Sequence, residues 1–170
     1  MTTLNMSNPF DISGKNAIVT GGAMGIGFGI AKRFVWAGAN VVIADLDAKA
    51  AEAAAAKLSR GPGKAVAIQV DISQPDAGDK MVKKCVDEFG SVDILVNNAG
   101  IFPNVPMMEM DRELFEKVLA INLTGLAYAS KAAAAQMIAQ KTGGRIINIA
   151  SIDAIHPSAV GLAAYDASKG

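Results

Sequence analysis

Short apolar runs alternate with segments of helical character along the chain, and this alternation is the strongest constraint on the fold. The runs are short and stop at glycine or a polar or small residue, which is typical of strands buried on both faces. The predicted strands are residues 16–20, 41–44, 65–70, 93–97 and 145–149. The predicted helices are residues 26–37, 48–58, 76–89 and 111–140, the last bent near Gly125, and 163–169 begins a further helix. The alternation predicts a doubly wound α/β domain, a parallel sheet with helices on both faces.

The length and charge of the chain narrow its class. A chain of 170 residues fits a single domain, 1–170, with a polar lead-in at 1–13. Basic and acidic side chains balance at 16 each, so the surplus of positive charge that nucleic-acid binding needs is missing. No apolar run reaches the roughly 20 residues of a membrane span. Much of the apolar content is alanine. We therefore expect neither a nucleic-acid nor a membrane partner.

The cysteine and histidine content bears on location and on metals. Cys85 is the only cysteine, so no internal disulfide can form and a reducing, cytoplasmic location is expected. His156 is the only histidine, which leaves no nitrogen and sulfur ligand set for structural zinc, and we expect no metal site. Residues 1–9 lack the basic and apolar regions of a signal peptide.

A glycine-rich segment links the first predicted strand to its helix. It reads Thr20-Gly21-Gly22-Ala23-Met24-Gly25-Ile26-Gly27. Such a turn lets the backbone approach a pyrophosphate, while the helix N-terminus supplies free N–H groups and a positive dipole end. A tight turn without a ligand is the alternative. The predicted cofactor contacts here are Thr20, Gly21, Gly25, Ile26 and Gly27.

An acidic residue after the second strand favours a particular cofactor. Asp45 comes twenty residues after Gly25, about the offset at which an acid meets the adenosine ribose. Its carboxylate would accept hydrogen bonds from ribose hydroxyls and repel a 2′-phosphate, and the neighbouring Met24 and Leu46 are not basic. The alternatives are a surface acid or a helix N-cap. The loop and Asp45 together predict NAD(H) as the cofactor.

Two further strand ends carry candidate contacts. Asp71, directly after the third strand, either bonds the adenine or caps the next helix, as Ser73 also could. The fourth strand ends in Asn97-Asn98-Ala99-Gly100, where small and amide residues let the chain turn under a cofactor and satisfy exposed backbone groups. A plain turn is the alternative. We take Asp71, Asn97, Ala99 and Gly100 as candidate cofactor contacts.

The candidate chemistry lies near the end of the chain. Tyr165 and Lys169 are four residues apart, so they are neighbours on one helix face. An ammonium beside a tyrosine favours the phenolate and suits the tyrosine to proton transfer. Ser151 follows the fifth strand at the edge of the sheet where ligands bind, and Asn122 is a polar residue in an apolar helical stretch that could bind a water. Each has a plain alternative: a chance pair, a turn serine and a helix-bending residue.

In combination and in this order, these motifs resemble the short-chain dehydrogenase/reductase family in its common short subclass. The resemblance runs from about residue 14 to Gly170 and rests on the glycine-rich loop, the Asn97–Gly100 turn, Asn122, Ser151 and the Tyr165/Lys169 pair. It implies a Rossmann-type sheet and hydride transfer between NAD and the carbon of a secondary alcohol or ketone. Within the family, the lead-in and the loop after Ser151 look most like 3-oxoacyl-carrier-protein reductase and glucose 1-dehydrogenase.

The resemblance also implies a role for each catalytic candidate. Tyr165 would be the acid/base, and Lys169 would bind the nicotinamide ribose and lower the tyrosine pKa, so both also count as cofactor contacts. Ser151 would orient the alcohol or ketone substrate, and Asn122 would support a proton relay. A homo-oligomer, dimer or tetramer, would form through the helix at 111–140 and the Tyr/Lys helix.

The chain stops one residue after Lys169, whereas family members continue. The resemblance therefore implies that C-terminal strands are missing, which leaves residues 145–149 as an apolar sheet edge and the Tyr/Lys helix about two turns long. We expect a 170-residue chain to be poorly soluble and to have little or no dehydrogenase activity. The alternative function is a truncated, non-catalytic dinucleotide-binding or interaction module. The substrate is not predicted, since the loops that select it come later in the family.

Overall fold

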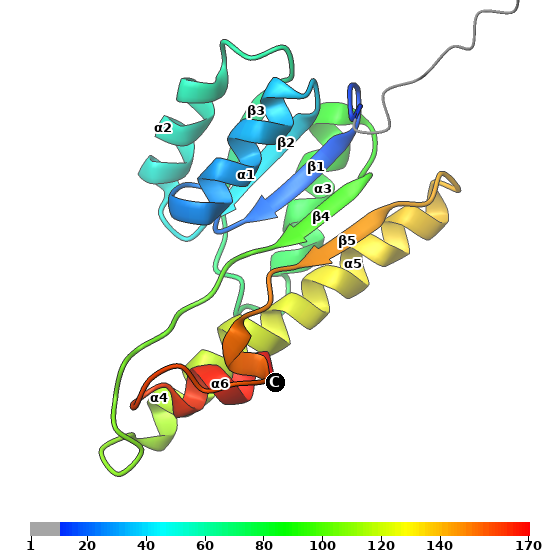
Figure 1. Cartoon of the computed structure of the whole chain (residues 1–170). Coiled ribbons are helices and arrows are strands. Elements are labelled where there is room, and N and C mark those ends of the chain that lie inside the picture. Colours follow the sequence, from blue (N-terminus) through cyan, green and yellow to red (C-terminus); the bar gives the residue numbers. More distant parts are fainter. Residues whose placement is uncertain (1–10) are drawn as a thin grey trace, which may run out of the picture.

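The computed structural model describes residues 11–170, so most of the predicted lead-in at 1–13, including residues 1–9, lies outside the described residues. Helices and strands alternate as predicted (Figure 1). The strands are β1 Asn16–Thr20, β2 Asn40–Asp45, β3 Ala65–Gln69, β4 Ile94–Asn97 and β5 Arg145–Asn148. The helices are α1 Gly25–Trp36, α2 Ala48–Leu58, α3 Ala77–Phe89, α4 Arg112–Leu119, α5 Leu126–Ala139 and α6 Ala163–Lys169, with a π-helical segment at Ala120–Gly125 and a 3-10 turn at Ile152–Ala154.

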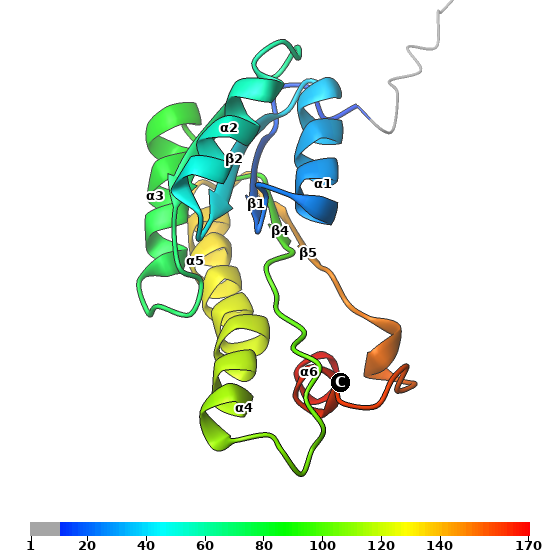
Figure 2. The ribbon, with the colours of Figure 1, turned by 90° about the vertical axis from the view of Figure 1, so that its left-hand side faces the viewer.

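The five strands form one parallel sheet in the order β3-β2-β1-β4-β5. Successive strand residues face opposite sides, so Ile18 packs with α3 and α5 whereas Val19 packs with α1 and α2. Figure 2 shows the two helical layers on either side of the sheet. The predicted doubly wound, Rossmann-type α/β fold is therefore confirmed. Because the strand order reverses between β1 and β4, a crevice is expected beyond their carboxyl ends.

The long helix predicted at 111–140 is built from three pieces. Between α4 and α5 the π-helical segment Ala120–Gly125 widens the helix near the predicted bend. A Cβ at Gly125 would lie 2.5 Å from the Ile72 carbonyl oxygen, so this glycine lets the helix pass close to the segment after β3. The widened turn carries Asn122.

The same stretch corrects one expectation about membrane spans. Arg112–Ala139 is long and apolar enough by length and composition to cross a membrane, with a mean hydropathy of 1.2 over its most apolar 18 residues. Its alanines explain this value without any long unbroken apolar run. In the fold, α5 packs on α3, and it places Ala129, Ala133 and Met137 in the core.

The fifth strand lies at an edge of the sheet in the part of the chain that the structure describes. All four residues of β5 are exposed, and Ile146 and Ile147 show 37% and 42% of their surface. The opposite edge is β3. An apolar strand edge of this kind was expected for residues 145–149.

The turn between β3 and α3 corrects another expectation. Neither Asp71 nor Ser73 caps α3, whose N-cap is Asp76. Instead, the Asp71 carboxylate accepts hydrogen bonds from the Ser73 hydroxyl at 2.7 Å and the Ser73 backbone N–H at 3.0 Å. These two bonds, the hydroxyl first, lower the pKa of Asp71. Asp71 therefore closes a local turn and keeps its carboxylate at the carboxyl edge of the sheet.

The contact between α3 and α5 depends on a missing side chain at Gly78. A Cβ there would lie 3.0 Å from both the Ala132 Cβ and the Tyr128 carbonyl oxygen. We expect Gly78→Ala to lower the free energy of unfolding by about 1–3 kcal/mol, because two helix backbones must separate. Gly29→Ala is the matched control: Gly29 lies in α1 with nothing within 4 Å of an added Cβ, and the change should stabilise by about 0.5–1 kcal/mol. Urea unfolding followed by circular dichroism measures both; equal effects would contradict this packing.

The Asp71 turn predicts a pH-dependent contribution to stability. Removing the Ser73 hydroxyl should raise the pKa of Asp71 and lower the free energy of unfolding by up to about 1 kcal/mol, since the carboxylate is partly solvated. A lowered carboxyl pKa stabilises the fold above the ordinary value, and this stability is lost as pH falls through the lowered one. The difference between the natural chain and Ser73→Ala should thus be full at neutral pH and close in acid. Ser59→Ala removes a hydroxyl that donates to the Ala56 carbonyl, and no titratable group takes part in this bond. The loss in free energy of unfolding for this control should therefore not change with pH.

Candidate active site

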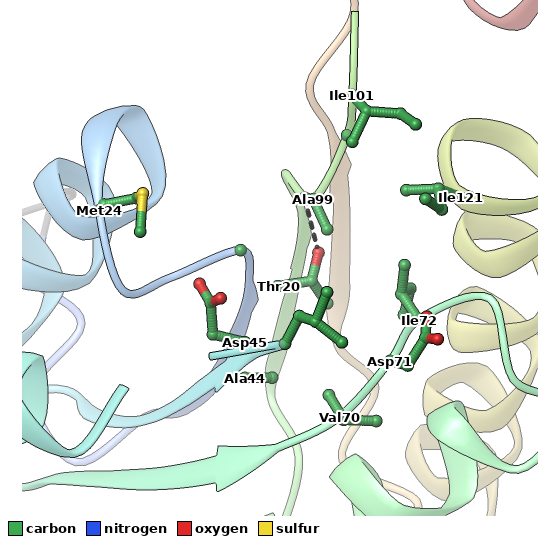
Figure 3. A pocket seen from close by; sticks show the side chains of 13 residues that line it. Thr20, Met24, Ala44, Asp45, Val70, Asp71, Ile72, Ala99, Ile101 and Ile121 are labelled. Carbon is green, nitrogen blue, oxygen red and sulfur yellow. Dashed lines mark hydrogen bonds between the residues drawn. The ribbon is translucent and has the colours of Figure 1, made fainter. Parts of the chain in front are cut away.

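A cleft of about 260 Å³ opens beyond the carboxyl ends of the central strands (Figure 3). It lies where the strand order reverses, as expected for ligand sites in open α/β sheets. Apart from Thr20, Asp45 and Asp71, the side chains that line it are apolar, and Met24 and Leu46 are largely exposed, at 61% and 65%. The predicted cofactor contacts that line it are Thr20, Gly21, Asp45, Asp71, Ala99 and Gly100.

Thr20 joins the loop after β1 to the loop after β4, and both loops line this cleft. Its buried hydroxyl accepts hydrogen bonds from the backbone N–H groups of Asn98 and Ala99, both at 3.0 Å, the second drawn in Figure 3. The Asn98 amide donates in return to the Thr20 and Gly21 carbonyls at 3.0 and 3.1 Å. The side chain of Thr20 is thus engaged within the protein, and Asn98, absent from the predicted contacts, fixes the loop after β4 to the glycine-rich loop.

The glycine-rich loop needs its glycines for different reasons. Gly21 and Gly25 have φ of +60° and +54°, a region that disfavours side chains. A Cβ at Gly21 would lie 3.0 Å from the Ala99 Cα, whereas one at Gly25 would meet no atom within 4 Å. At Gly27 a Cβ would collide with the Gly21 carbonyl oxygen. The loop is therefore packed closely against the segment after β4 on one side and open at the N-terminus of α1. Ile26 lies in the first turn of α1 and is exposed, outside the residues that line the cleft.

Asp45 also supports this loop. Its carboxylate accepts the Ala23 N–H at 3.0 Å and the Asp47 N–H at 3.2 Å. The N-cap of α2 is Asp47, which accepts the Ala50 N–H, so the alternative of Asp45 as a helix cap is wrong. The Asp45 carboxylate, which lines the cleft, is thus bonded to the glycine-rich loop, which also lines it.

Asn97 lies away from the cleft. It is buried at 3% exposure, and its amide donates to the Ser130 hydroxyl and to the Asn148 amide oxygen, both at 2.9 Å. Its backbone carbonyl accepts the Ile149 N–H at 3.0 Å. The structure therefore gives Asn97 a position that joins β4 to β5 and α5.

Tyr165 and Lys169 lie together on α6, as the spacing predicts. The Lys169 ammonium lies 5.7 Å from the centre of the Tyr165 ring. The Tyr165 and Phe102 rings pack edge to face, with their centres 6.0 Å apart. Lys169 donates to the Ile149 carbonyl at 2.8 Å. Burial lowers the pKa of Lys169, because desolvation disfavours the charged ammonium. The segments after β4 and β5 therefore meet α6 at Tyr165 and Lys169.

Asn122 connects three segments beneath α6. It is buried at 1% exposure; its amide oxygen accepts the Ile101 N–H and its amide nitrogen donates to the Ile101 carbonyl, both at 2.9 Å. The same nitrogen donates to the Ser168 hydroxyl at 2.9 Å, which in turn donates to the Tyr165 carbonyl at 2.7 Å. Ser168 was not among the predicted site residues. The sequence feature that could have pointed to it is a hydroxyl side chain directly before Lys169 on the same helix.

Ser151 is engaged with its own loop. Its hydroxyl donates to the Asp153 carboxylate at 2.8 Å and accepts the Asp153 N–H at 3.2 Å. The other carboxylate oxygen of Asp153 accepts the Ser158 N–H at 2.8 Å. Bonds from Ser158 and then Ser151 lower the pKa of Asp153. Within residues 11–170 no hydrogen bond joins Ser151 to Tyr165. Asp153 was not among the predicted residues, although an acid two positions after the serine was its signal.

Comparison with known proteins places the chain in a family. The family model described as short chain dehydrogenase matches residues 15–170. Sorbitol dehydrogenase of Cereibacter sphaeroides is 44% identical over 82% of this chain and 54% of its own length, and 3β-hydroxysteroid dehydrogenase 2 of Eggerthella lenta is 39% identical over 93% and 61%.

A solved structure agrees. A short-chain type dehydrogenase/reductase from Mycobacterium marinum superposes with a TM-score of 0.89 at 37% identity, covering 94% of this chain and 63% of that one. The chain thus spans a little over half the length of these relatives. It belongs to the short-chain dehydrogenase family.

Proposed function

We propose that the chain carries the cofactor and proton-transfer machinery of an NAD(H)-dependent oxidoreductase that interconverts a secondary alcohol and a ketone. The observation that carries the proposal is the Tyr165–Lys169 pair, with the ammonium 5.7 Å from the ring centre, on the helix that Asn122 anchors through Ser168. Residues 1–170 would then be a single dinucleotide-binding domain. The family membership of the chain supports the reaction type.

The cleft suits a dinucleotide. The open side of Gly25 leaves room for a phosphate at the N-terminus of α1, where N–H groups are free, and the apolar walls suit a flat aromatic base. Asp45 lies where a ribose would be bound, and its carboxylate keeps free lone pairs beside its bonds to Ala23 and Asp47. Among residues 11–170, no basic side chain lines this cleft, which supports NAD(H) over NADP(H). A bound nicotinamide would supply the hydride acceptor or donor.

The residues around α6 would move the proton. Tyr165 would take the proton from an alcohol or give it to a ketone at its hydroxyl, and the nearby Lys169 ammonium would stabilise the phenolate. Lys169, now bonded to the Ile149 carbonyl, has two further N–H groups for ribose hydroxyls. Asn122 would hold the helix in position through Ser168, and Ser151 would orient the substrate.

The relatives support an alcohol as the substrate class. Those found include dehydrogenases of sorbitol, galactitol and 3β-hydroxysteroids. The narrower resemblance to 3-oxoacyl-carrier-protein reductase and glucose 1-dehydrogenase stays a prediction. A homo-oligomer is part of the proposal, because the helical stretch 112–139 exposes apolar side chains such as Leu123 and Ile138, at 48% and 76%. A cytoplasmic location is proposed from the single cysteine of the chain.

The cofactor assignment is tested at Asp45. Asp45→Ala should weaken NADH binding about tenfold, the loss of roughly one hydrogen bond to a charged group, and weaken NADPH binding less because a repulsion is also removed. Loosening of the Ala23 turn affects both cofactors, so the ratio of their dissociation constants is the diagnostic quantity. Asp47→Ala should cost about 1 kcal/mol of stability through the lost cap and leave the ratio unchanged. Fluorescence titration measures the dissociation constants of NADH and NADPH for each variant. An unchanged ratio of the two in Asp45→Ala would contradict the assignment.

The proton-transfer role is tested with the two tyrosines of the chain. In the whole protein, Tyr165→Phe should lower NAD⁺-dependent oxidation of a secondary alcohol by about 100-fold or more, because the proton acceptor is lost, while NADH binding stays. Tyr128→Phe is the matched control, since Lys131 lies 5.8 Å from that ring centre on the exposed side of α5. Steady-state kinetics and NADH titration measure the split. Turnover that survives in Tyr165→Phe would refute the role, and NADH binding without turnover in the whole protein would instead identify a dinucleotide-binding module.

A further inference from the structure

The outer face of α1 carries a shallow groove that is separate from the cleft. Gly27, Ala31 and Val35 are buried and face the sheet. The groove on the opposite face has a volume of about 260 Å³ and is lined by Gly29, Lys32, Arg33 and Trp36. It shares no residue with the cleft at the strand ends. Figure 2 shows α1 on the other side of the sheet from α3 and α5, at the outside of the fold.

The residue types in this α1 groove are those of a binding surface. Gly29 and Trp36 are seven residues apart, about two helical turns, so they lie on one face. A Cβ at Gly29 would meet no atom within 4 Å, so the space above this glycine is open. Trp36 is the only tryptophan of the chain and is 56% exposed. Tryptophan and arginine are among the residue types that most often anchor protein interfaces.

The α1 groove is also positively charged. Lys32 and Arg33 are both exposed, and neither forms an ion pair within residues 11–170. Helix α1 itself contains no acidic residue. Arg33 lies in the last turn, where a cation stabilises the helix dipole. That effect does not account for Lys32 beside it or for the exposed ring of Trp36.

A third cation lies at the C-terminal end of the same helix. A Cβ at Gly61 would collide with Val35, so the turn after α2 packs against α1, and Arg60 on this turn is exposed. Asp11 lies at this end too, because it accepts the N–H of Ser13, whose hydroxyl donates to the C-cap carbonyl of α1 at 3.4 Å. The three basic side chains outnumber this acid.

We propose that the α1 groove docks an acidic segment of a partner protein. One apolar side chain of that segment lies over Gly29 and packs on Trp36, while flanking carboxylates pair with Lys32 and Arg33. Charge complementarity selects this partner. Nucleic acid would require a surplus of positive charge, whereas the chain balances 16 basic with 16 acidic groups. A membrane surface would require a wider apolar face than one exposed ring provides.

The proposal does not rest on the oxidoreductase function, and its test is a peptide titration of the whole protein. The probe is a peptide with one leucine flanked on each side by three glutamates. Anisotropy of a fluorescein-labelled copy gives the dissociation constant. A change in tryptophan emission with the unlabelled copy, absent in Trp36→Phe, places the peptide in the α1 groove.

Two changes in the peptide separate charge from apolar contact. We expect glutamine in place of glutamate to weaken binding about tenfold or more, and alanine in place of leucine to weaken it severalfold. Saturating NADH should leave the peptide bound, because the α1 groove and the cleft share no residue. Equal binding of the glutamine peptide, or displacement by NADH, would overturn the proposal.

Variants test the two contributions from the side of the protein. Lys32→Gln/Arg33→Gln should weaken peptide binding about tenfold, because two ion pairs are lost. Gly29→Leu fills the space above the helix without a change in charge and should weaken binding by a similar factor. Leucine is also a better helix former than glycine, so this variant should fold.

The matched control removes two adjacent positive charges on the other side of the sheet. Lys83→Gln/Lys84→Gln, in α3, should leave the affinity for the peptide unchanged. Equal losses in the two double variants would reduce the binding to net charge and overturn the proposal. Tighter binding of single-stranded DNA, or of vesicles that contain phosphatidylserine, than of the peptide at the same ionic strength would assign the face to another kind of partner and overturn it as well.

Discussion

The hydroxyl of Thr20 is the contact on which the rest of the site depends. Two backbone N–H groups, of Asn98 and Ala99, end on this one buried oxygen, which itself donates to the Val96 carbonyl. Buried backbone donors are costly when unpaired, so the arrangement fixes the separation of the β1 and β4 loops. Both loops line the cleft, together with residues at the ends of β2 and β3. These hydrogen bonds therefore fix part of the cleft lining before any cofactor binds.

The two halves of the site are held in different ways. The cleft is formed by the ends of strands that the sheet itself holds, with Asp45 tying one strand end to the glycine-rich loop. The tyrosine and lysine instead lie on a helix of seven residues, which is too short to be stable alone. Three side-chain contacts compensate: Asn122 to Ser168, Lys169 to the Ile149 carbonyl, and Phe102 against Tyr165. The position of the reactive group is thus decided by segments distant in sequence.

This division explains what could be predicted from the sequence. Strand ends follow from local composition, so Thr20, Gly21 and Asp45 were correctly expected near one edge of the sheet. Asn97 and Asn98 are adjacent, and the pleat directs neighbours to opposite faces, so the motif alone did not say that Asn97 points away from the cleft. Asn122 bonds partners 21 and 46 residues away. Such pairings depend on how segments distant in sequence fold back on one another, which local patterns do not encode.

The π-helical segment around Asn122 has a consequence for how this site can vary. One extra residue is accommodated in a helical turn, so α4 and α5 are out of phase with the register that a continuous α-helix would give them. A helix advances about 100° per residue, so deleting any one residue between 120 and 125 would rotate everything before it by that angle. Ile101 and Ser168 would then face a different side of the helix. Substitutions can alter the chemistry of this position, but only a change in chain length can create or remove it.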